Sequence, residues 1–80
     1  MATDDLPLLP TPTLGRYRHY KGNESELIGV VRHSETLEPL VLYRPLYGRG
    51  DLWVRPYAMF FETVEVDGVS RPRFAPMEPR

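Results

Sequence analysis

Short stretches of alternating hydrophobic and polar residues run along this chain, and turn-forming residues separate them. Runs rich in β-forming residues cover 16–21, 27–32, 40–46, 52–55, 63–66 and 69–74. A period of two places successive side chains on opposite faces of a strand. The pattern therefore predicts five or six short strands.

The connections between these runs carry recognisable turn signals. Asp67-Gly68 lies between two β runs and is a strong hairpin signal, and Gly22-Asn23 and Gly48–Asp51 indicate further turns. Gly29, inside the second run, predicts a bulge or bend. Pro56–Phe61 predicts a single short helical turn, because proline favours a first helical position.

So few short strands bury a face well only when the sheet curls on itself. We therefore expect an all-β fold, a small five- to six-stranded SH3-like barrel with one short helical turn near residues 56–61. An OB-type barrel is the nearest alternative, but that fold usually carries a longer helix between its middle strands. The alternation predicts a core of Ile28, Val30, Leu40, Leu42, Val54, Phe60, Val64 and Val66.

The length of 80 residues suits one domain. Residues 1–14 hold three prolines among leucines, and this spacing blocks both helix and ladder hydrogen bonds. We therefore expect a disordered Pro-rich leader over 1–14, the β-barrel domain over 15–74 and a flexible tail over 75–80.

Composition and charge narrow the class of protein further. The absence of cysteine excludes disulfides, thiolate zinc sites and cysteine nucleophiles, and favours a reducing compartment. Neither a signal peptide nor an apolar run of about 20 residues is present. We expect a cytoplasmic monomer with no membrane partner. The net charge of −1 argues against strong non-specific polyanion binding, although residues 15–60 carry a formal +2.

Several ordered motifs lie between residues 15 and 74. They are G-x-Y-x-H-Y-K-G, then R-H-S-E-T, Y-R-x-L-Y-G and W-V-R-P-x-x-M-F. This pattern resembles one bacterial family of short, stand-alone domains of unknown function. The resemblance implies an architecture similar to SH3-like barrels. It implies no activity, so no catalytic or ligand-binding role is transferred from it.

The chain offers little catalytic chemistry. His33-Ser34-Glu35 has the H-x-E spacing of zinc deaminases, but those sites also need a P-C-x-x-C motif. A different metal-dependent site would require His19, His33 and Glu35 to converge in space. Neither a G-x-S-x-G elbow nor a glycine-rich phosphate loop is present. We assign no catalytic residue, metal or cofactor and do not expect an enzyme; a small metal-dependent enzyme around the two histidines stays an alternative.

Interleaved aromatic and basic residues are the remaining signal, and they favour a non-catalytic binding module. Aromatic platforms beside Lys or Arg suit single-stranded nucleic acid, which we slightly prefer, and they also suit an extended peptide or a protein partner. The simpler explanation is that aromatic residues have high β propensity and stabilise sheets without a ligand. The candidate binding residues are Tyr17, His19, Lys21, His33, Glu35, Tyr43, Tyr47, Trp53 and Arg55.

Overall fold

A computed structural model describes residues 6–78, which form seven β-strands and one short helix. The strands are β1 (Gly15–His19), β2 (Glu24–Arg32), β3 (Pro39–Pro45), β4 (Trp53–Pro56), β5 (Thr63–Val66), β6 (Val69–Pro72) and β7 (Phe74–Pro76), and the helix is α1 (Tyr57–Phe60). The first five residues of the predicted leader and the last two of the predicted tail lie outside the described residues. No helix within 6–78 is long and apolar enough to cross a membrane.

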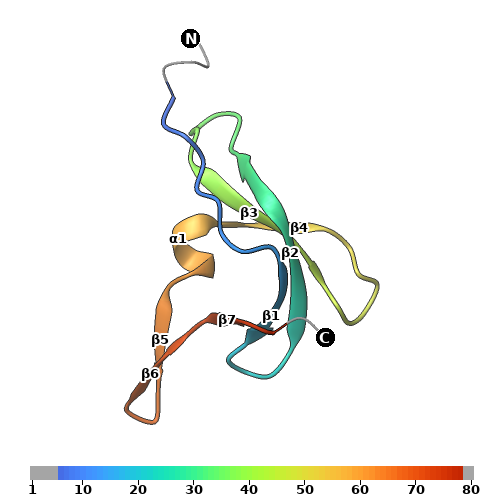
Figure 1. Cartoon of the computed structure of the whole chain (residues 1–80), viewed down its shortest axis with the longest axis vertical. Helices are drawn as coiled ribbons and strands as arrows, with labels where there is room; N and C mark the ends of the chain where they lie inside the picture. Colours follow the sequence, from blue (N-terminus) through green and yellow to red (C-terminus); the bar gives the residue numbers. More distant parts are fainter. Residues whose placement is uncertain (1–5, 79–80) are drawn as a thin grey trace.

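Two antiparallel sheets make up the fold. The larger has the strand order β4-β3-β2-β1-β7, and β5 and β6 form a separate hairpin that projects away from it (Figure 1). The predicted all-β class and the single helical turn are confirmed. Within residues 6–78, β4 and β7 remain the edges of the main sheet, so its ladder does not close into a barrel. The likeness to SH3-like barrels stays a prediction.

The last predicted β run is divided into two strands at Arg73, which raises the strand count to seven. The Arg73 N–H donates to the Glu62 carbonyl at 2.8 Å, and the Arg73 carbonyl accepts from the Tyr20 N–H at 2.9 Å. Here the chain leaves the hairpin and joins β1, where Phe74 pairs with His19. A single residue thereby connects the two sheets.

The predicted hairpin turn at Asp67-Gly68 is confirmed. Both residues have positive φ, 51° and 78°, and Val66 pairs directly with Val69. Two positive φ angles in a two-residue turn match the right-handed twist of the flanking strands. Asp and Gly are therefore favoured here because both tolerate this backbone conformation.

The predicted bulge in the second β run is also confirmed. Leu27 pairs with Tyr43, and the next pair along the ladder joins Gly29 to Leu42, so Ile28 is an extra residue in β2. An extra residue changes which positions of the bulged strand share a face with the partner strand.

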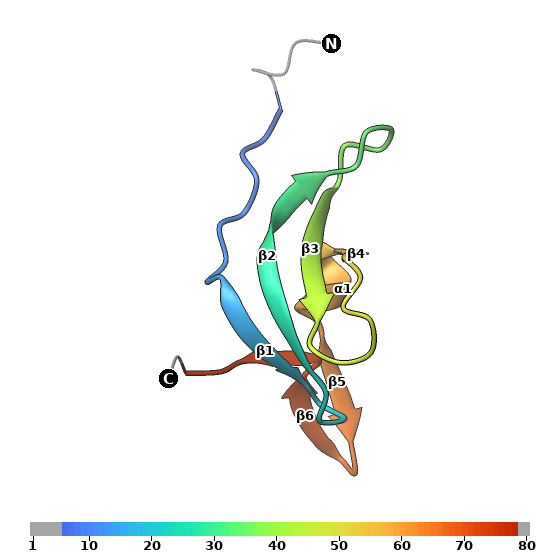
Figure 2. The same ribbon diagram turned by 90° about the vertical axis from the view of Figure 1, so that its right-hand side faces the viewer.

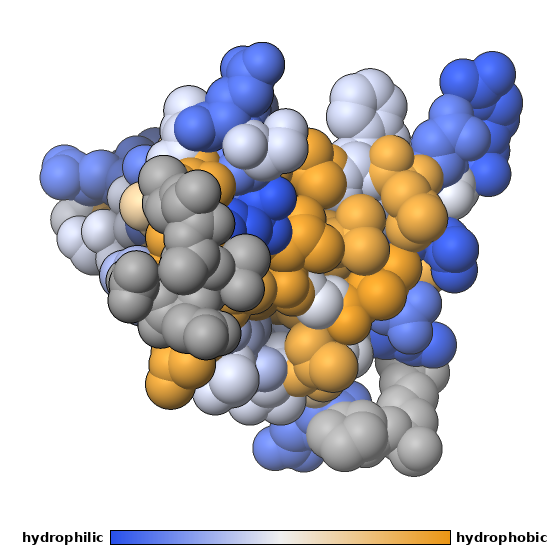
Figure 3. All heavy atoms as spheres, turned by 90° about the horizontal axis from the view of Figure 1, so that it is seen from above, coloured by the Kyte–Doolittle hydropathy of each residue, from blue (hydrophilic) through white to orange (hydrophobic). Residues whose placement is uncertain are grey.

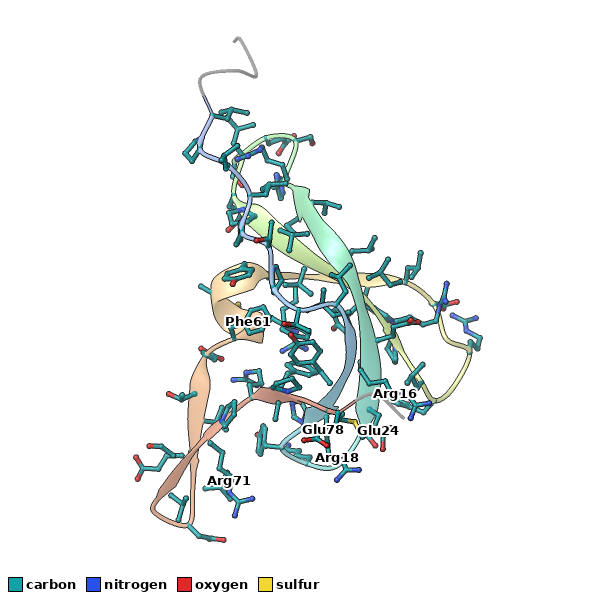
Figure 4. The ribbon with its side chains drawn as sticks, viewed as in Figure 1. Arg16, Arg18, Glu24, Phe61, Arg71 and Glu78 are labelled. Atoms are coloured by element: carbon teal, nitrogen blue, oxygen red, sulfur yellow. The ribbon has the colours of Figure 1, made fainter. Side chains whose placement is uncertain are left out.

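The core lies between α1 and the inner face of the main sheet. Phe60 of α1 is fully buried and stacks on Phe74 with ring centroids 4.1 Å apart and nearly parallel planes. Tyr17 meets Phe60 edge-on at 5.5 Å, and Phe61 points inward to meet Tyr17 at 5.8 Å (Figure 4). The buried hydrophobic residues are Tyr17, Leu27, Val41, Tyr43, Phe60 and Phe74.

The predicted core was largely wrong, since Phe60 is the one member that is buried. Val54 is 51% exposed, and the other predicted members are half-buried: Ile28, Val30, Leu40, Leu42, Val64 and Val66. Val41 and Tyr43, at the odd positions of β3, face the core. Leu40 and Leu42 of the other alternating set are apolar too, and the interpretation placed this set inside, although it also contains the exposed Arg44.

The outer face of the main sheet is divided into a charged part and an apolar part. Arg16 and Arg18 both approach the Glu24 carboxylate, at 3.7 and 3.2 Å (Figure 4). Farther along, Leu42 pairs with the exposed Val54. Seen from above, this end of the molecule exposes apolar surface between hydrophilic residues (Figure 3). The ion pairs of Arg16 and Arg18 with Glu24 are largely exposed, so they contribute little to stability.

Residues 6–14 run in extended form beside the upper end of β2 (Figure 2). Arg32 Nη2 donates to the Pro7 carbonyl at 2.6 Å, and the Tyr17 hydroxyl donates to the Thr13 carbonyl at 2.7 Å. Neither contact is a ladder hydrogen bond, as expected for a segment with three prolines. Two side chains of the domain therefore hold this segment.

We predict that Phe60→Ala lowers the free energy of unfolding by about 3–5 kcal/mol, because it removes a fully buried ring and leaves a cavity. Urea denaturation followed by far-UV circular dichroism measures the loss. Met59→Ala, at a neighbouring position of α1 that is 47% exposed, is the control and should cost far less. Equal midpoints for the two variants would contradict this description of the core.

Candidate functional site

An open hollow of about 520 Å³ lies on the inner face of the main sheet, beside the core. The β1–β2 turn, the β3–β4 loop, β4 and β7 surround it. We call it the aromatic-basic groove. Its aromatic lining consists of His19, Tyr43, Tyr47, Trp53 and Phe74.

Strand pairing brings these rings together from distant parts of the chain. His19 of β1 pairs with Phe74 of β7, and Tyr43 of β3 pairs with Trp53 of β4. Directly paired residues share a face of the sheet, so each pair places two rings on the inner face. Tyr43 is 8% exposed and forms part of the floor, whereas Trp53 and Tyr47 are 57% and 55% exposed.

The groove is cationic although the chain as a whole is not. Lys21, Arg49 and Arg55 line it together with a single acid, Asp51, which gives a formal +2. Arg49 binds Asp51 at 2.7 Å. Within residues 6–78, neither Lys21 nor Arg55 forms an ion pair. The Arg55 guanidinium lies 5.6 Å from the centre of the Phe74 ring, a cation–π geometry that holds it at the groove.

His19 supplies a neutral polar group to the groove. Burial lowers the pKa of its imidazole, and the nearby charges of Arg73, Arg55 and Lys21 lower it further. Its Nδ1 accepts a hydrogen bond from the Lys21 backbone N–H at 3.2 Å. A neutral imidazole whose Nδ1 accepts carries its proton on Nε2. We therefore assign Nε2–H as the hydrogen-bond donor of this side chain, and it has no acceptor among residues 6–78.

The structure brings together six of the nine predicted binding residues. Those that line the groove are His19, Lys21, Tyr43, Tyr47, Trp53 and Arg55. Tyr17 instead lies in the core at 3% exposure, with its hydroxyl bound to the leader.

His33 and Glu35 lie at the opposite end of the sheet, in the loop between β2 and β3. His33 Nδ1 accepts from the backbone N–H of Glu35 at 3.0 Å and of Thr36 at 3.2 Å, so this ring organises its own loop. His19 adjoins the start of β2 and His33 follows its end, and a nine-residue strand spans roughly 30 Å. The three residues of the metal-site hypothesis are thus not brought together, and residues 6–78 contain no group of three His, Asp or Glu side chains placed to hold a metal.

Sequence reasoning missed Phe74, Arg49 and Asp51 as groove residues. Arg49 and Asp51 were interpreted only as turn residues, although their loop joins the two strands that carry Tyr43 and Trp53. Phe74 reaches the groove through the pairing of β7 with β1, which joins residues more than fifty positions apart. No local pattern signals such a long-range pairing.

Comparison with known proteins places this architecture in a family. The family model described as "Protein of unknown function (DUF1653)" matches residues 15–76. A crystal structure of a DUF1653 protein from Bordetella bronchiseptica is similar, with a TM-score of 0.74 and 33% sequence identity over 99% of this chain and 100% of that one. A search of curated proteins finds no match. The chain belongs to the DUF1653 family, as its sequence motifs predicted.

We predict that His19 titrates below the ordinary histidine pKa of about 6.5, because burial and three cations disfavour its charged form. Arg55→Met should raise this pKa while leaving it below the ordinary value, since burial remains. The unfolded chain then binds the proton at higher pH than the folded chain, so the His19 contribution to stability is lost as the pH falls below about 6.5.

The titration is followed by NMR through the ring carbon-bound protons of His19. Arg44→Met removes an exposed arginine outside the groove lining and is the matched control. A His19 midpoint above the ordinary value, or one that Arg55→Met and Arg44→Met move equally, would refute the proposed surroundings of this ring.

Proposed function

We propose that this DUF1653 protein is a non-catalytic module that binds single-stranded nucleic acid in the aromatic-basic groove. One observation carries the proposal: two exposed aromatic rings, Trp53 and Tyr47, line the same hollow as two cations without ion-pair partners in residues 6–78, Lys21 and Arg55. Exposed rings can stack on bases, and the cations can contact the phosphates between them.

The charges of the groove favour nucleic acid over a cationic ligand. Aromatic rings can also form a cage for a methylated ammonium group. Here the lining carries three cationic side chains and one acidic side chain, so it would repel such a cationic ligand. A strand of nucleotides offers ring faces and negative charge together. The neutral His19 adds a hydrogen-bond donor that can meet an acceptor on a base edge or a phosphate oxygen.

The arrangement also favours a single strand over a duplex. The groove offers ring faces, which stack only on bases that are not already stacked in a helix. With a net charge of −1, the chain lacks the broad positive field that draws most duplex binders to the phosphate backbone.

We predict that Trp53→Ala weakens binding of a single-stranded uridine hexamer by about 5- to 150-fold, the equivalent of one lost stack of about 1–3 kcal/mol. Leu52→Ala removes a neighbouring side chain that is 52% exposed but does not line the groove, and it should leave the affinity unchanged. Two-dimensional NMR titration of the labelled protein measures both affinities and locates the shifts.

Shifts confined to residues outside the groove, or equal affinities of the two variants, would refute the proposed surface. If the hexamer causes no shift at low salt and a Pro-rich peptide shifts Trp53 and Tyr47, the module binds peptides and the nucleic-acid proposal is wrong.

We also predict a shallow salt dependence. If Lys21 and Arg55 each neutralise one phosphate, these two contacts contribute about −1.4 to the slope of log K against log salt for a single strand. By themselves they lower the affinity for the hexamer about sevenfold between 50 and 200 mM salt. Lys21→Gln should make the slope shallower by about 0.7, and a slope unchanged by this substitution would contradict a phosphate contact at Lys21.

A further inference from the structure

A second hollow of about 420 Å³ lies between the end of β1 and the projecting β5–β6 hairpin. Arg18 and Tyr20 line one side, and Val69, Arg71 and Pro72 of the hairpin line the other. His19 lines both this hollow and the aromatic-basic groove, so the two hollows share one residue. We call this second hollow the hairpin subsite.

Aromatic rings continue without interruption from the groove into the hairpin subsite. On one side, His19 meets Phe74 of the groove edge-on with centroids 4.9 Å apart. On the other, it lies 4.5 Å from the ring of Tyr20, and Lys21 Nζ lies 5.7 Å from the centre of that same ring. The rings of Phe74, His19 and Tyr20 therefore form a continuous row from the aromatic-basic groove to the hairpin subsite, and the Lys21 ammonium group lies beside this row.

The hairpin subsite is cationic as well. Its lining includes Arg18 and Arg71 and no acidic residue. Arg18 shares the Glu24 carboxylate with Arg16, whereas Arg71 forms no ion pair among residues 6–78. Figure 4 shows Arg71 on the hairpin and Arg18 on β1, at the same end of the molecule. Because all of β6 is exposed, Arg71 is accessible to a ligand.

We propose that the hairpin subsite binds the next nucleotide of the strand held in the aromatic-basic groove, with Tyr20 against the base and Arg71 on a phosphate. This inference rests on the proposed function, and it names the ligand more closely as a strand of several nucleotides rather than a free nucleotide. A ligand that bridges His19 engages both hollows, and the second contact then forms at the high effective concentration that the first provides.

The test compares two ligands, uridine monophosphate and the uridine hexamer, on the intact chain and its variants. The wild type should bind the hexamer at least about tenfold more tightly than the monophosphate, since only the hexamer occupies both hollows. Arg71→Ala should weaken hexamer binding about three- to fivefold, as for an exposed charge contact, without changing the affinity for the monophosphate. Arg16→Ala removes an arginine that lines neither hollow and should change neither affinity.

NMR shifts give an independent measurement. The hexamer should shift the amides of Tyr20 and Val69 in addition to those of the groove, whereas the monophosphate should shift groove residues alone. Equal affinity for the two ligands, or hexamer binding that Arg71→Ala does not weaken, would overturn the hairpin subsite. If Trp53→Ala still weakens binding in that case, the proposed function stands. If Trp53→Ala leaves every affinity unchanged, the proposed function itself is wrong.

Discussion

Phe74 stacks on Phe60 with ring planes almost parallel and centroids 4.1 Å apart, and this contact joins the C-terminal strand, the single helical turn and the main sheet. The other contacts of the Phe74 ring belong to the groove, where His19 meets it edge-on and the Arg55 guanidinium lies over it. The ring that anchors α1 therefore also positions a neutral donor and a cation of the candidate site. A change that loosens this stack would disturb both the core and the groove, so a loss of stability and a loss of the proposed binding are expected together at this residue.

The local signals of the sequence were sufficient for the elements but not for their faces. Asp67-Gly68 and Gly29 identified a hairpin turn and a bulge, because these features depend on the backbone of one or two residues. The inner face of β3 depends instead on what packs against it. Leu40 and Leu42 are at least as apolar as Val41 and Tyr43, so hydrophobicity alone favours the wrong set, and the packing of α1 against Val41 and Tyr43 decides which face is buried.

The candidate site was predictable to the extent that it follows from neighbouring strands. Tyr43 and Trp53 lie on two strands joined by one loop, so an antiparallel hairpin brings these strands side by side, and the structure shows that the two residues pair directly. Tyr17 was misplaced because aromatic residues in strands pack in cores and also line binding surfaces, and the alternation does not distinguish the two. Phe74 and Arg71 depend on the path of the chain after the β5–β6 hairpin, which the Arg73 backbone contacts determine and no sequence motif indicates.

The distribution of charge connects the fold to the kind of ligand it suits. Asp51 is the one acid lining either hollow within the described residues, while Glu24 lies on the outer face between two arginines and Glu35 at the far loop. The two hollows are thus locally cationic on a chain whose net charge is −1, and beyond the Debye length of about 8 Å at physiological salt the field they share is weak. For the proposed nucleic-acid ligand, long-range attraction would then contribute little, and the affinity would depend on ring faces in direct contact with the ligand. Bases that are already stacked in a helix cannot provide such contacts, and this supports the proposal of an unpaired strand over a duplex.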